Sequence, residues 1–274
     1  MITLKFKAYG KINPFLYVGE KRNDGFHEVV TVMHKATVYD TLTVTETEKS
    51  GIRITSDDAT LPTGRDNLIY RAVEELHKAV GSPIEAMKTG YDIHVEKRIP
   101  VAGGMGGGSA DAGYMLKHLN AALGCPLSTD VLCGIAAELG SDVPFFVYDH
   151  DTMLATGRGE KLTAYPTLPK CRMEFISCGS KPSTGAMFNA LDRNREATDT
   201  VTAPDLNLLT EAVQRGKLRE ICDNFYNSFE AVFRAQSPEY AQSLLNAKKT
   251  LTDRGAVGVL LCGSGPTVCG IFEE

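Results

Sequence analysis

The part of this 274-residue sequence with the clearest chemical use is a glycine-rich run. Residues 100–110 read PVAGGMGGGSA, with five glycines in six residues, directly before an amphipathic stretch. Without side chains in the way, the N–H groups of such a loop can turn toward one anion, and the start of a helix adds unpaired donors and about half a positive charge. The run therefore predicts a phosphate-binding loop.

The run does not match the two commonest nucleotide-binding patterns. Gly103 and Gly108 have the P-loop spacing, but Ser109 and Ala110 follow where Lys and Ser or Thr are required. The dinucleotide pattern fails as well, because its sixth position would be Ser109 rather than glycine or alanine. Taken alone, the run could be a flexible linker, and the second short loop at 261–267 (LCGSGPT) could be a simple hairpin turn. Linkers rarely lie between a strand and a helix, so we favour an anion site.

Composition limits the kinds of partner. The formal charge of −5 gives no general attraction to nucleic acid or to an anionic membrane, so phosphates must be held by a local device. No apolar run approaches the roughly 20 residues of a spanning helix, and the first residues lack the apolar region of a signal peptide. Seven cysteines without a C-x-x-C pair indicate reduced, structural thiols. We expect a cytoplasmic protein with small-molecule partners, and neither nucleic acid nor membrane among them.

Hydrophobic periodicity predicts an α+β chain, with the glycine loop between a strand and a helix. In the first half we expect strands at 4–18, 29–44, 91–95, 145–148 and 152–155, and helices at 70–80, 109–123 and 129–139, the first capped by Asp66. In the second half we expect strands at 172–177, 257–261 and 267–272, helices at 185–191, 206–214, 226–234 and 238–253, and a mobile loop at 198–204. A change of character near 166–169 predicts domains at 1–165 and 166–274.

Three segments resemble, in order and spacing, the three motifs of the GHMP kinase superfamily. They are AYGKINPFL at 8–16, PVAGGMGGGSADA at 100–112 and LLCGSGPTV at 260–268. Four further segments look like the 4-diphosphocytidyl-2-C-methyl-D-erythritol kinase family: KIN at 11–13, RNDGFHE at 22–28, DNLI at 66–69 and GSDVPFF at 140–146. The resemblance covers nearly the whole chain.

The resemblance implies a two-domain GHMP kinase fold, with an N-terminal domain like domain 2 of ribosomal protein S5 and a ferredoxin-like C-terminal domain. It also implies transfer of the γ-phosphoryl group of ATP, with Mg²⁺, to the 2-hydroxyl of 4-diphosphocytidyl-2-C-methyl-D-erythritol in non-mevalonate isoprenoid biosynthesis. Both substrates would bind between the domains. The oligomeric state, monomer or weak dimer, stays open.

The family's functional residues carry over one by one. Asp142 matches the catalytic base and Lys11 the neighbouring lysine, two groups that in-line phosphoryl transfer can use. Taken alone, Asp142 would be a turn cap and Lys11 a solvated surface lysine. The ATP-binding residues implied are Asn67, Pro100, Val101, Ala102, Gly103, Gly104, Met105, Gly106, Gly107, Gly108, Ser109 and Ala110.

The resemblance also implies how the cytidyl substrate is bound. His27 would read the cytosine edge while Phe26 and Phe188 stack on its two faces, and Asn13 would bind the erythritol or its phosphates. Phe26 stands where we expect tyrosine, which preserves stacking but loses a hydroxyl group. Without the family resemblance, His27 would be interpreted as an exposed polar residue, Phe188 as a core aromatic and Asn13 as a turn residue.

Two departures and two alternatives remain. Asn227-Ser228 stands where the family often has Asn-Asp, and the glycine loop offers one hydroxyl, that of Ser109, so Mg²⁺ would be held largely through phosphates and water, with no protein ligand predicted. Another GHMP kinase, acting on homoserine or mevalonate, would need no cytosine reader. A nucleotide-binding regulator would need neither Lys11 nor Asp142.

Overall fold

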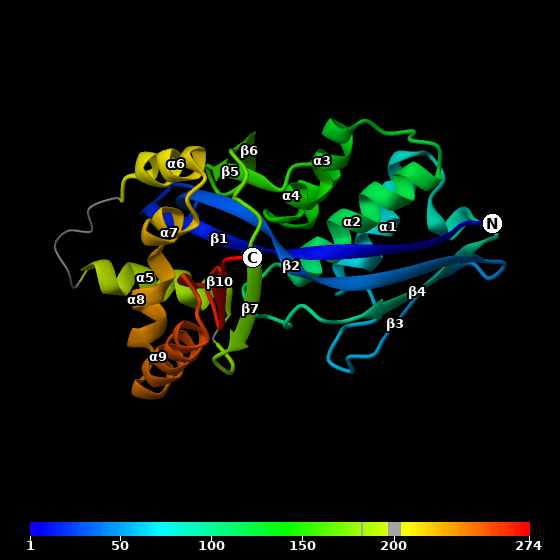
Figure 1. Ribbon diagram of the computed structural model, residues 1–274. Coiled ribbons are helices and arrows are strands. Elements are labelled where there is room, and N and C mark those ends of the chain that lie inside the picture. Colours follow the sequence, from blue (N-terminus) through cyan, green and yellow to red (C-terminus); the bar gives the residue numbers. More distant parts are fainter. Residues whose placement is uncertain (182, 197–203) are drawn as a thin grey trace. The chain divides into compact units, whose positions relative to one another are not determined.

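The computed structural model describes residues 1–181, 183–196 and 204–274, which form two compact units (Figure 1). Unit 1 comprises Met1–Gly10, Val38–Val101 and Gly106–Asp149, and unit 2 comprises Lys11–Thr37, Ala102–Met105 and His150–Glu274. Two long strands, β1 (Thr3–Lys21) and β2 (His27–Thr47), contribute residues to both units. The predicted domains at 1–165 and 166–274 stay a prediction.

Unit 1 contains the end of β2 and the start of β1, and two shorter strands continue the sheet beyond β2. β2 runs antiparallel to β4 (Gly90–Glu96), with Leu42 opposite Val95, and β3 (Gly51–Ser56) runs parallel to β4. Ile54, Ile93 and Val95 are buried where apolar residues alternate with polar ones, as expected of strands with one buried face.

The helices of unit 1 pack closely on one another. They are α1 (Leu68–Ala79), the 3₁₀ turn η1 (Ile84–Ala86), α2 (Gly107–Ala122), α3 (Thr129–Leu139) and α4 (Val143–Val147). The buried residues Ile69, Val73 and Leu76 recur at helical spacing along α1. A Cβ atom at Gly113 of α2 would lie 2.6 Å from Cβ of Phe146, so only glycine allows α4 to approach α2 this closely.

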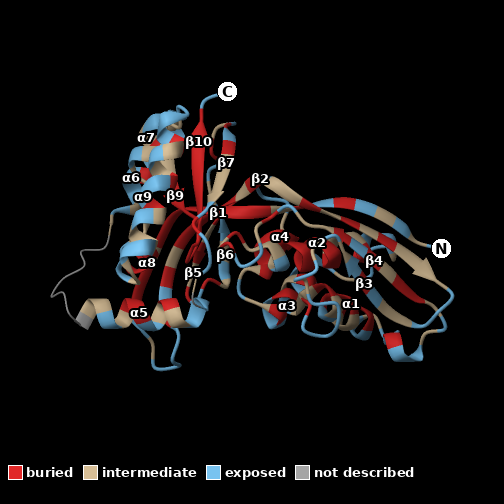
Figure 2. Ribbon diagram, turned by 90° about the horizontal axis from the view of Figure 1, so that it is seen from below, coloured by how far each residue is buried: buried red, intermediate tan, exposed pale blue. Residues whose placement is uncertain are grey.

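Unit 2 contains two groups of strands. The end of β1 pairs in parallel with β8 (Tyr226–Asn227), and the start of β2 pairs with β5 (Thr152–Thr156), which pairs with β6 (Lys161–Ala164). A separate antiparallel sheet has the order β7 (Arg172–Ser177), β10 (Thr267–Phe272), β9 (Gly258–Leu261). Every residue of β10 is buried, as its red colour in Figure 2 shows.

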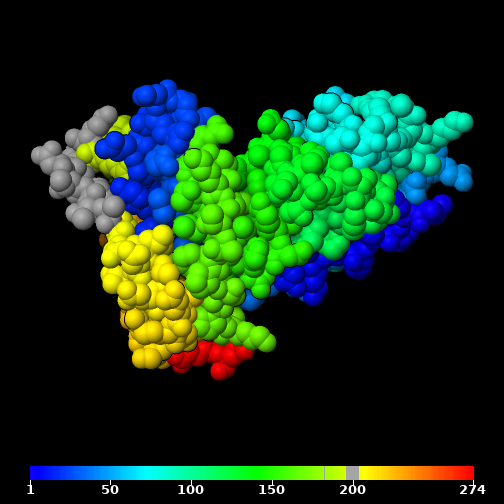
Figure 3. All heavy atoms as spheres, turned by 90° about the horizontal axis from the view of Figure 1, so that it is seen from above, coloured from blue at the N-terminus to red at the C-terminus, as the bar shows by residue number. Residues whose placement is uncertain are grey.

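The helices of unit 2 complete its core. They are α5 (Thr184–Glu196), α6 (Leu206–Arg215), α7 (Leu218–Asp223), α8 (Ser228–Ala235) and α9 (Pro238–Asp253). Phe233 of α8 and Leu251 of α9 are fully buried in one apolar cluster. Arg219 pairs with Glu273 at 3.3 Å, where Figure 3 shows the C-terminal residues at the surface beside α6 and α7. No helix in the described ranges has both the length and the apolar character needed to cross a membrane.

The predicted elements agree with the structure where local periodicity is strong. The predictions at 129–139, 172–177, 238–253 and 267–272 coincide with α3, β7, α9 and β10. The predicted strand at 145–148 is wrong: these residues lie in and just after α4, because Pro144 suits a first helical turn and a short apolar run does not distinguish a strand from a buried helix. Of the loop predicted at 198–204, residues 198–203 lie outside the described residues.

Candidate active site

The second half of the glycine-rich run opens helix α2 in unit 1. Gly106 has the left-handed conformation (φ 69°) and caps the helix, and Ala110 N donates to Gly106 O at 2.7 Å as the first helical bond. The N–H groups of Gly107, Gly108 and Ser109 precede that bond, so they have no acceptor within the helix. Since the first turn of α2 also contains no acidic residue, its N-terminus can attract an anion.

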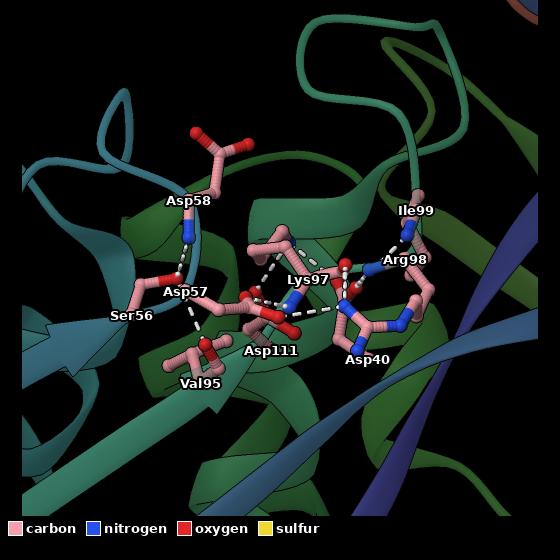
Figure 4. Close-up of polar contacts among 9 residues, drawn as sticks. All are labelled: Asp40, Ser56, Asp57, Asp58, Val95, Lys97, Arg98, Ile99 and Asp111. Carbon is pink, nitrogen blue, oxygen red and sulfur yellow. Dashed lines mark hydrogen bonds and ion pairs between the residues drawn. The ribbon is translucent and has the colours of Figure 1, made fainter.

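The carboxylates of Asp40 and Asp57 hold the backbone that leads into the glycine-rich loop, and Figure 4 shows them with their hydrogen-bond partners. Three successive backbone N–H groups donate to them: Lys97 N to Asp57 Oδ1 at 2.7 Å, Arg98 N to Asp40 Oδ1 at 2.5 Å, and Ile99 N to the same Asp40 oxygen at 2.9 Å. The next residue is a proline without an N–H group. Because each donor is satisfied, the backbone leading to the loop is held in one conformation.

Lys97 connects this loop entry with helix α2. Its ammonium group, whose side chain is 5% exposed, pairs with Asp40 and donates to Asp111 Oδ2 at 2.9 Å (Figure 4). A Cβ atom at Gly107 would lie 3.4 Å from Lys97 Nζ, so the ammonium lies directly beneath the first residue of α2. Asp40, Lys97 and Asp111, here called the Lys97 triad, therefore tie β2, the end of β4 and α2 together.

In the Lys97 triad, the two buried carboxyl groups of Asp40 and Asp111 share one ammonium group. Burial opposes protonation of Lys97, but Asp111 and Asp40 outweigh it and raise the pKa of that lysine. Burial raises the pKa of Asp111 to about 7, with Lys97 opposing and Asp40 adding to the rise. Asp111 Oδ1 is buried without a hydrogen-bond partner among the described residues. A proton shared between the two carboxyl groups would leave the triad without net charge.

Asn67 lies at the start of α1, next to the glycine loop. Asn67 Oδ1 accepts from Ile69 N at 2.9 Å and its Nδ2 donates to Pro62 O at 2.7 Å, so this residue caps α1 and the predicted cap Asp66 was wrong by one position. A Cβ atom at Gly108 would lie 3.9 Å from Leu68 Cδ1, which brings the first turns of α1 and α2 side by side.

Asp142 occupies the N-cap position of α4, but its side chain makes no capping hydrogen bond to that helix. It is half-buried. The carbonyl oxygen of Val143 would lie 2.9 Å from a Cβ atom at Gly113, so the start of α4 packs against the second turn of α2. Because the side chain of Asp142 makes no capping hydrogen bond, the alternative in which Asp142 is only a helix cap is not supported.

Lys11, in unit 2, is at the start of a chain of buried hydrogen bonds. Its Nζ donates to Asn13 Oδ1 at 2.7 Å, Asn13 Nδ2 donates to Thr31 Oγ1 at 2.9 Å, and that hydroxyl donates to Phe15 O at 2.7 Å. Lys11 is 5% exposed, so it is not the solvated surface lysine that its sequence alone would suggest. Asn13 orients Lys11, a contact that the sequence did not reveal.

The C-terminal glycine loop packs against the first half of the glycine-rich run within unit 2. Gly104 (φ 82°) would place a Cβ atom 2.0 Å from Cys262 O, so only glycine fits between the two loops. Asn227 clamps the same loop, because its Nδ2 donates to Leu261 O at 2.7 Å and to Gly263 O at 2.8 Å while its Oδ1 caps α8. A Cβ atom at Gly263 would lie 3.1 Å from Lys11 Nζ, so this loop and Lys11 are neighbours.

His27 and Phe188 lie together, and a third residue joins them. The two rings are stacked with centroids 5.1 Å apart, and His27 Nε2 lies 2.6 Å from Asp192 Oδ1. Phe26 is separate, 55% exposed, with the Arg158 guanidinium 4.9 Å from its ring centroid. Sequence reasoning missed Asp192, which is 165 residues away and one turn beyond Phe188 on α5.

The described residues were compared with the side chains that a bound Mg²⁺ would require. In the part of the chain that the structure describes, no group of three or more His, Cys, Asp or Glu side chains could hold a metal ion. Of the loop's side chains, that of Ser109 supplies a hydroxyl donor. This sparse donor set is compatible with Mg²⁺, which keeps several waters and commonly binds through substrate phosphates and one or two carboxylates.

Comparison with known proteins decides the family. Residues 67–150 match the model of the GHMP kinases N terminal domain. The chain is 39% identical over its whole length to 4-diphosphocytidyl-2-C-methyl-D-erythritol kinase of Bacillus cytotoxicus, covering 89% of it. The enzyme of that name from Enterococcus faecalis is 36% identical over 98% of this chain and 89% of its own. This chain belongs to the 4-diphosphocytidyl-2-C-methyl-D-erythritol kinase family.

Solved structures agree with this membership. A crystal structure of 4-(cytidine 5'-diphospho)-2C-methyl-D-erythritol kinase aligns with a TM-score of 0.78 at 30% identity, over 99% of this chain and 91% of the other. The homoserine kinase of Cytophaga hutchinsonii aligns with a TM-score of 0.68 at 18% identity, over 98% and 84% of the two chains. At that identity the homoserine kinase shows only that the α+β GHMP kinase fold is shared. As a kinase of this family, the protein uses ATP.

Proposed function

We propose that this protein transfers the γ-phosphoryl group of ATP to the 2-hydroxyl of 4-diphosphocytidyl-2-C-methyl-D-erythritol, a step of non-mevalonate isoprenoid precursor biosynthesis. The observation that carries the proposal is the 39% identity over the whole chain to a kinase of that name. The cytoplasm remains the predicted location, with small molecules as the partners.

In this proposal the glycine loop holds the phosphates of ATP. The N–H groups of Gly107, Gly108 and Ser109, which have no acceptor within the helix, donate to phosphate oxygens, with the dipole of α2 behind them. Asn67 would lie near the nucleotide, because it caps α1 and the first turn of α1 lies beside the glycine loop. Mg²⁺, when bound with ATP, neutralises charge on the phosphate oxygens, and the Ser109 hydroxyl is the loop's own donor toward it.

Asp142 and Lys11 would take the two chemical roles. Asp142 matches the catalytic base of the family, and a carboxylate can accept the proton of the attacking hydroxyl. An ammonium fixed by Asn13 can stabilise negative charge on the transferring group without reorganising. Asn13 then acts on substrate through Lys11 as well as through the predicted direct contact with erythritol or its phosphates.

The pair formed by His27 and Asp192 supports recognition of cytosine. A carboxylate only accepts, so His27 Nε2–H donates to Asp192, and in the neutral tautomer that this bond selects Nδ1 is an acceptor. An acceptor at that position matches the exocyclic amino group of cytosine, which donates. Phe188 and Phe26 would supply the stacking surfaces.

The first experiment is an assay of ADP release with ATP and Mg²⁺, in which the cytidyl substrate is run beside homoserine and mevalonate. Turnover confined to the cytidyl substrate is the expected result. Activity on homoserine or mevalonate instead would keep the fold and the loop but reject the proposed substrate. An Asp142→Asn preparation run in parallel should lose turnover while retaining ATP affinity, which excludes a contaminating kinase.

The cytosine assignment has its own test. His27→Ala should weaken binding of the cytidyl substrate about tenfold while ATP affinity stays the same, since one hydrogen bond to the base is removed and the amino group of cytosine is left unpaired. Calorimetric titration of both ligands measures this directly. Normal binding of the cytidyl substrate by the variant would show that His27 does not read the base.

A further inference from the structure

Lys181 lies in the segment between β7 and α5, outside every motif on which the family resemblance rests. Its side chain reaches the C-terminal glycine loop, where Nζ donates to the hydroxyl of Ser264 and also to Thr184 Oγ1 at 3.2 Å. Ser264 is itself 6% exposed. The ammonium therefore ends at the loop 262–266 rather than in solvent.

Lys181 has neutral partners only. Within residues 1–181, 183–196 and 204–274 no carboxylate pairs with it, and both of its hydrogen-bond partners are hydroxyl groups. Lys97, by comparison, is held between two carboxyl groups. A half-buried ammonium costs desolvation energy that hydroxyl groups repay only partly, so an anion binding beside it would be stabilised.

A second cation lies at the same loop. Lys11 Nζ would be 3.1 Å from a Cβ atom at Gly263, the residue before Ser264. Burial, and next the charge of Lys11, lower the pKa of Lys181 to about 8. Two ammonium groups beside one loop repel each other, and a phosphoryl group bound there would reduce that repulsion.

The loop beside the two lysines is held by hydrogen bonds and carries no bulky side chain. Asn227 fixes its carbonyl groups, and Gly265 N donates to Cys262 O at 2.8 Å to close the turn. A fixed loop with two cations beside it matches the tetrahedral oxygens of a phosphoryl group, which accept hydrogen bonds from several directions.

We propose that Lys181 is a phosphate-binding residue that, together with Lys11, holds a phosphoryl group of the reactants at Gly263 and Ser264. The inference rests on the proposed kinase function and deepens it, because it adds a second cation to the phosphoryl-binding site. The phosphoryl group can come from ATP or from the diphosphate of the cytidyl substrate.

The variants that test it are Lys181→Met, which keeps the length and loses the charge, and Lys181→Arg, which keeps the charge. Lys170→Met serves as the matched control, because Lys170 is exposed in the same unit and pairs with no carboxylate in the described residues. Steady-state kinetics with each substrate varied in turn, and a thermal melt of each variant, are the measurements.

We expect Lys181→Met to lower kcat/KM about ten- to hundredfold, the range for a hydrogen bond to a charged group, with an unchanged melting temperature. Lys181→Arg should recover a substantial part and Lys170→Met should match the wild type. A higher KM for ATP identifies its phosphates as the ligand, a higher KM for the cytidyl substrate identifies its diphosphate, and a lower kcat alone identifies the group in transfer.

A binding experiment keeps this inference separate from the substrate assignment. Calorimetry with inorganic tripolyphosphate needs no turnover, and Lys181→Met should bind it about tenfold more weakly than the wild type even if the cytidyl substrate proves wrong. Kinetic constants within twofold of the wild type together with equal tripolyphosphate affinity would overturn the role of Lys181. Loss of activity that Lys181→Arg fails to recover, with a lowered melting temperature, would also overturn it, since the residue would then be structural.

Discussion

Each of the two glycine loops has a buried or half-buried lysine beside it, and the two lysines differ in their partners. Lys97, beneath the start of α2, lies between the carboxyl groups of Asp40 and Asp111. Within the described residues, Lys181 at the C-terminal loop has the hydroxyls of Ser264 and Thr184 as its hydrogen-bond partners and no carboxylate. A lysine neutralised by the protein contributes to stability, whereas one left without a counter-charge is available to a ligand. The partners, not the residue type, separate a structural lysine from a binding lysine.

Replacing Lys97 should have the largest effect on stability. Lys97→Met leaves two buried carboxyl groups without their cation, so we expect the free energy of unfolding to fall by about 3–5 kcal/mol. Urea denaturation measures the change, and the exposed Lys88 in the same unit provides the control Lys88→Met. A loss below about 1 kcal/mol would mean that Lys97 is not the structural member of the comparison.

Replacing Asn227 should have the second largest effect on stability, because this residue holds the C-terminal glycine loop by hydrogen bonds rather than by ion pairs. Asn227→Ala removes two hydrogen bonds to loop carbonyls and the cap of α8, and we expect a loss of about 2–3 kcal/mol. Hydrogen exchange of residues 262–267 should speed up in the variant. Unchanged exchange there would show that the loop is held by packing alone.

Asp111 should make stability depend on pH. Its pKa is about 7 in the folded protein, above the ordinary 3.8, so its contribution is full below about pH 4 and is lost as pH rises toward about 7. The wild type minus Asp111→Asn difference in unfolding free energy should therefore fall across that window, by at most about 1.4 kcal/mol for each pH unit. A difference that stays flat would place the shared proton elsewhere in the triad.

Lys181 should have the smallest effect on stability. Because Lys181 has no carboxylate partner in the part of the chain that the structure describes, Lys181→Met should change the free energy of unfolding by no more than about 0.5 kcal/mol, despite its loss of catalytic efficiency. Urea denaturation beside Lys97→Met tests the comparison directly. Equal losses for the two variants would erase the distinction between the lysines.

Much of the fold was predictable because its signals are local. Helix α9 begins with Ser237 and Pro238 and continues with helical periodicity, and its predicted bounds coincide with those observed. The strand predicted at 145–148 failed because the burial of Phe145 and Phe146 against α2, rather than their propensity, decides that they are helical. β3 and α7 were not predicted.

The candidate site also contains residues that the sequence could indicate and residues that it could not. Gly104 and Gly106 belong to the glycine-rich run that the sequence predicted as a phosphate-binding loop, and the family resemblance assigned roles to Lys11, Asp142 and His27. The residues that position them were not visible, because each lies far away in sequence. Asp192 is 165 residues from His27, and Ser264 is 83 residues from Lys181. A pattern of spacing cannot indicate a hydrogen bond between distant segments.

By itself the sequence determined the family, the glycine loops and the elements with strong periodicity, because backbone freedom and amphipathic spacing are properties of neighbouring residues. Only the tertiary structure decided which charges are neutralised. Lys97 meets Asp40 across 57 residues, and Lys181 meets hydroxyls instead of carboxylates. The free energy of a buried charge depends on the groups within a few ångströms, and those groups are brought together by the fold.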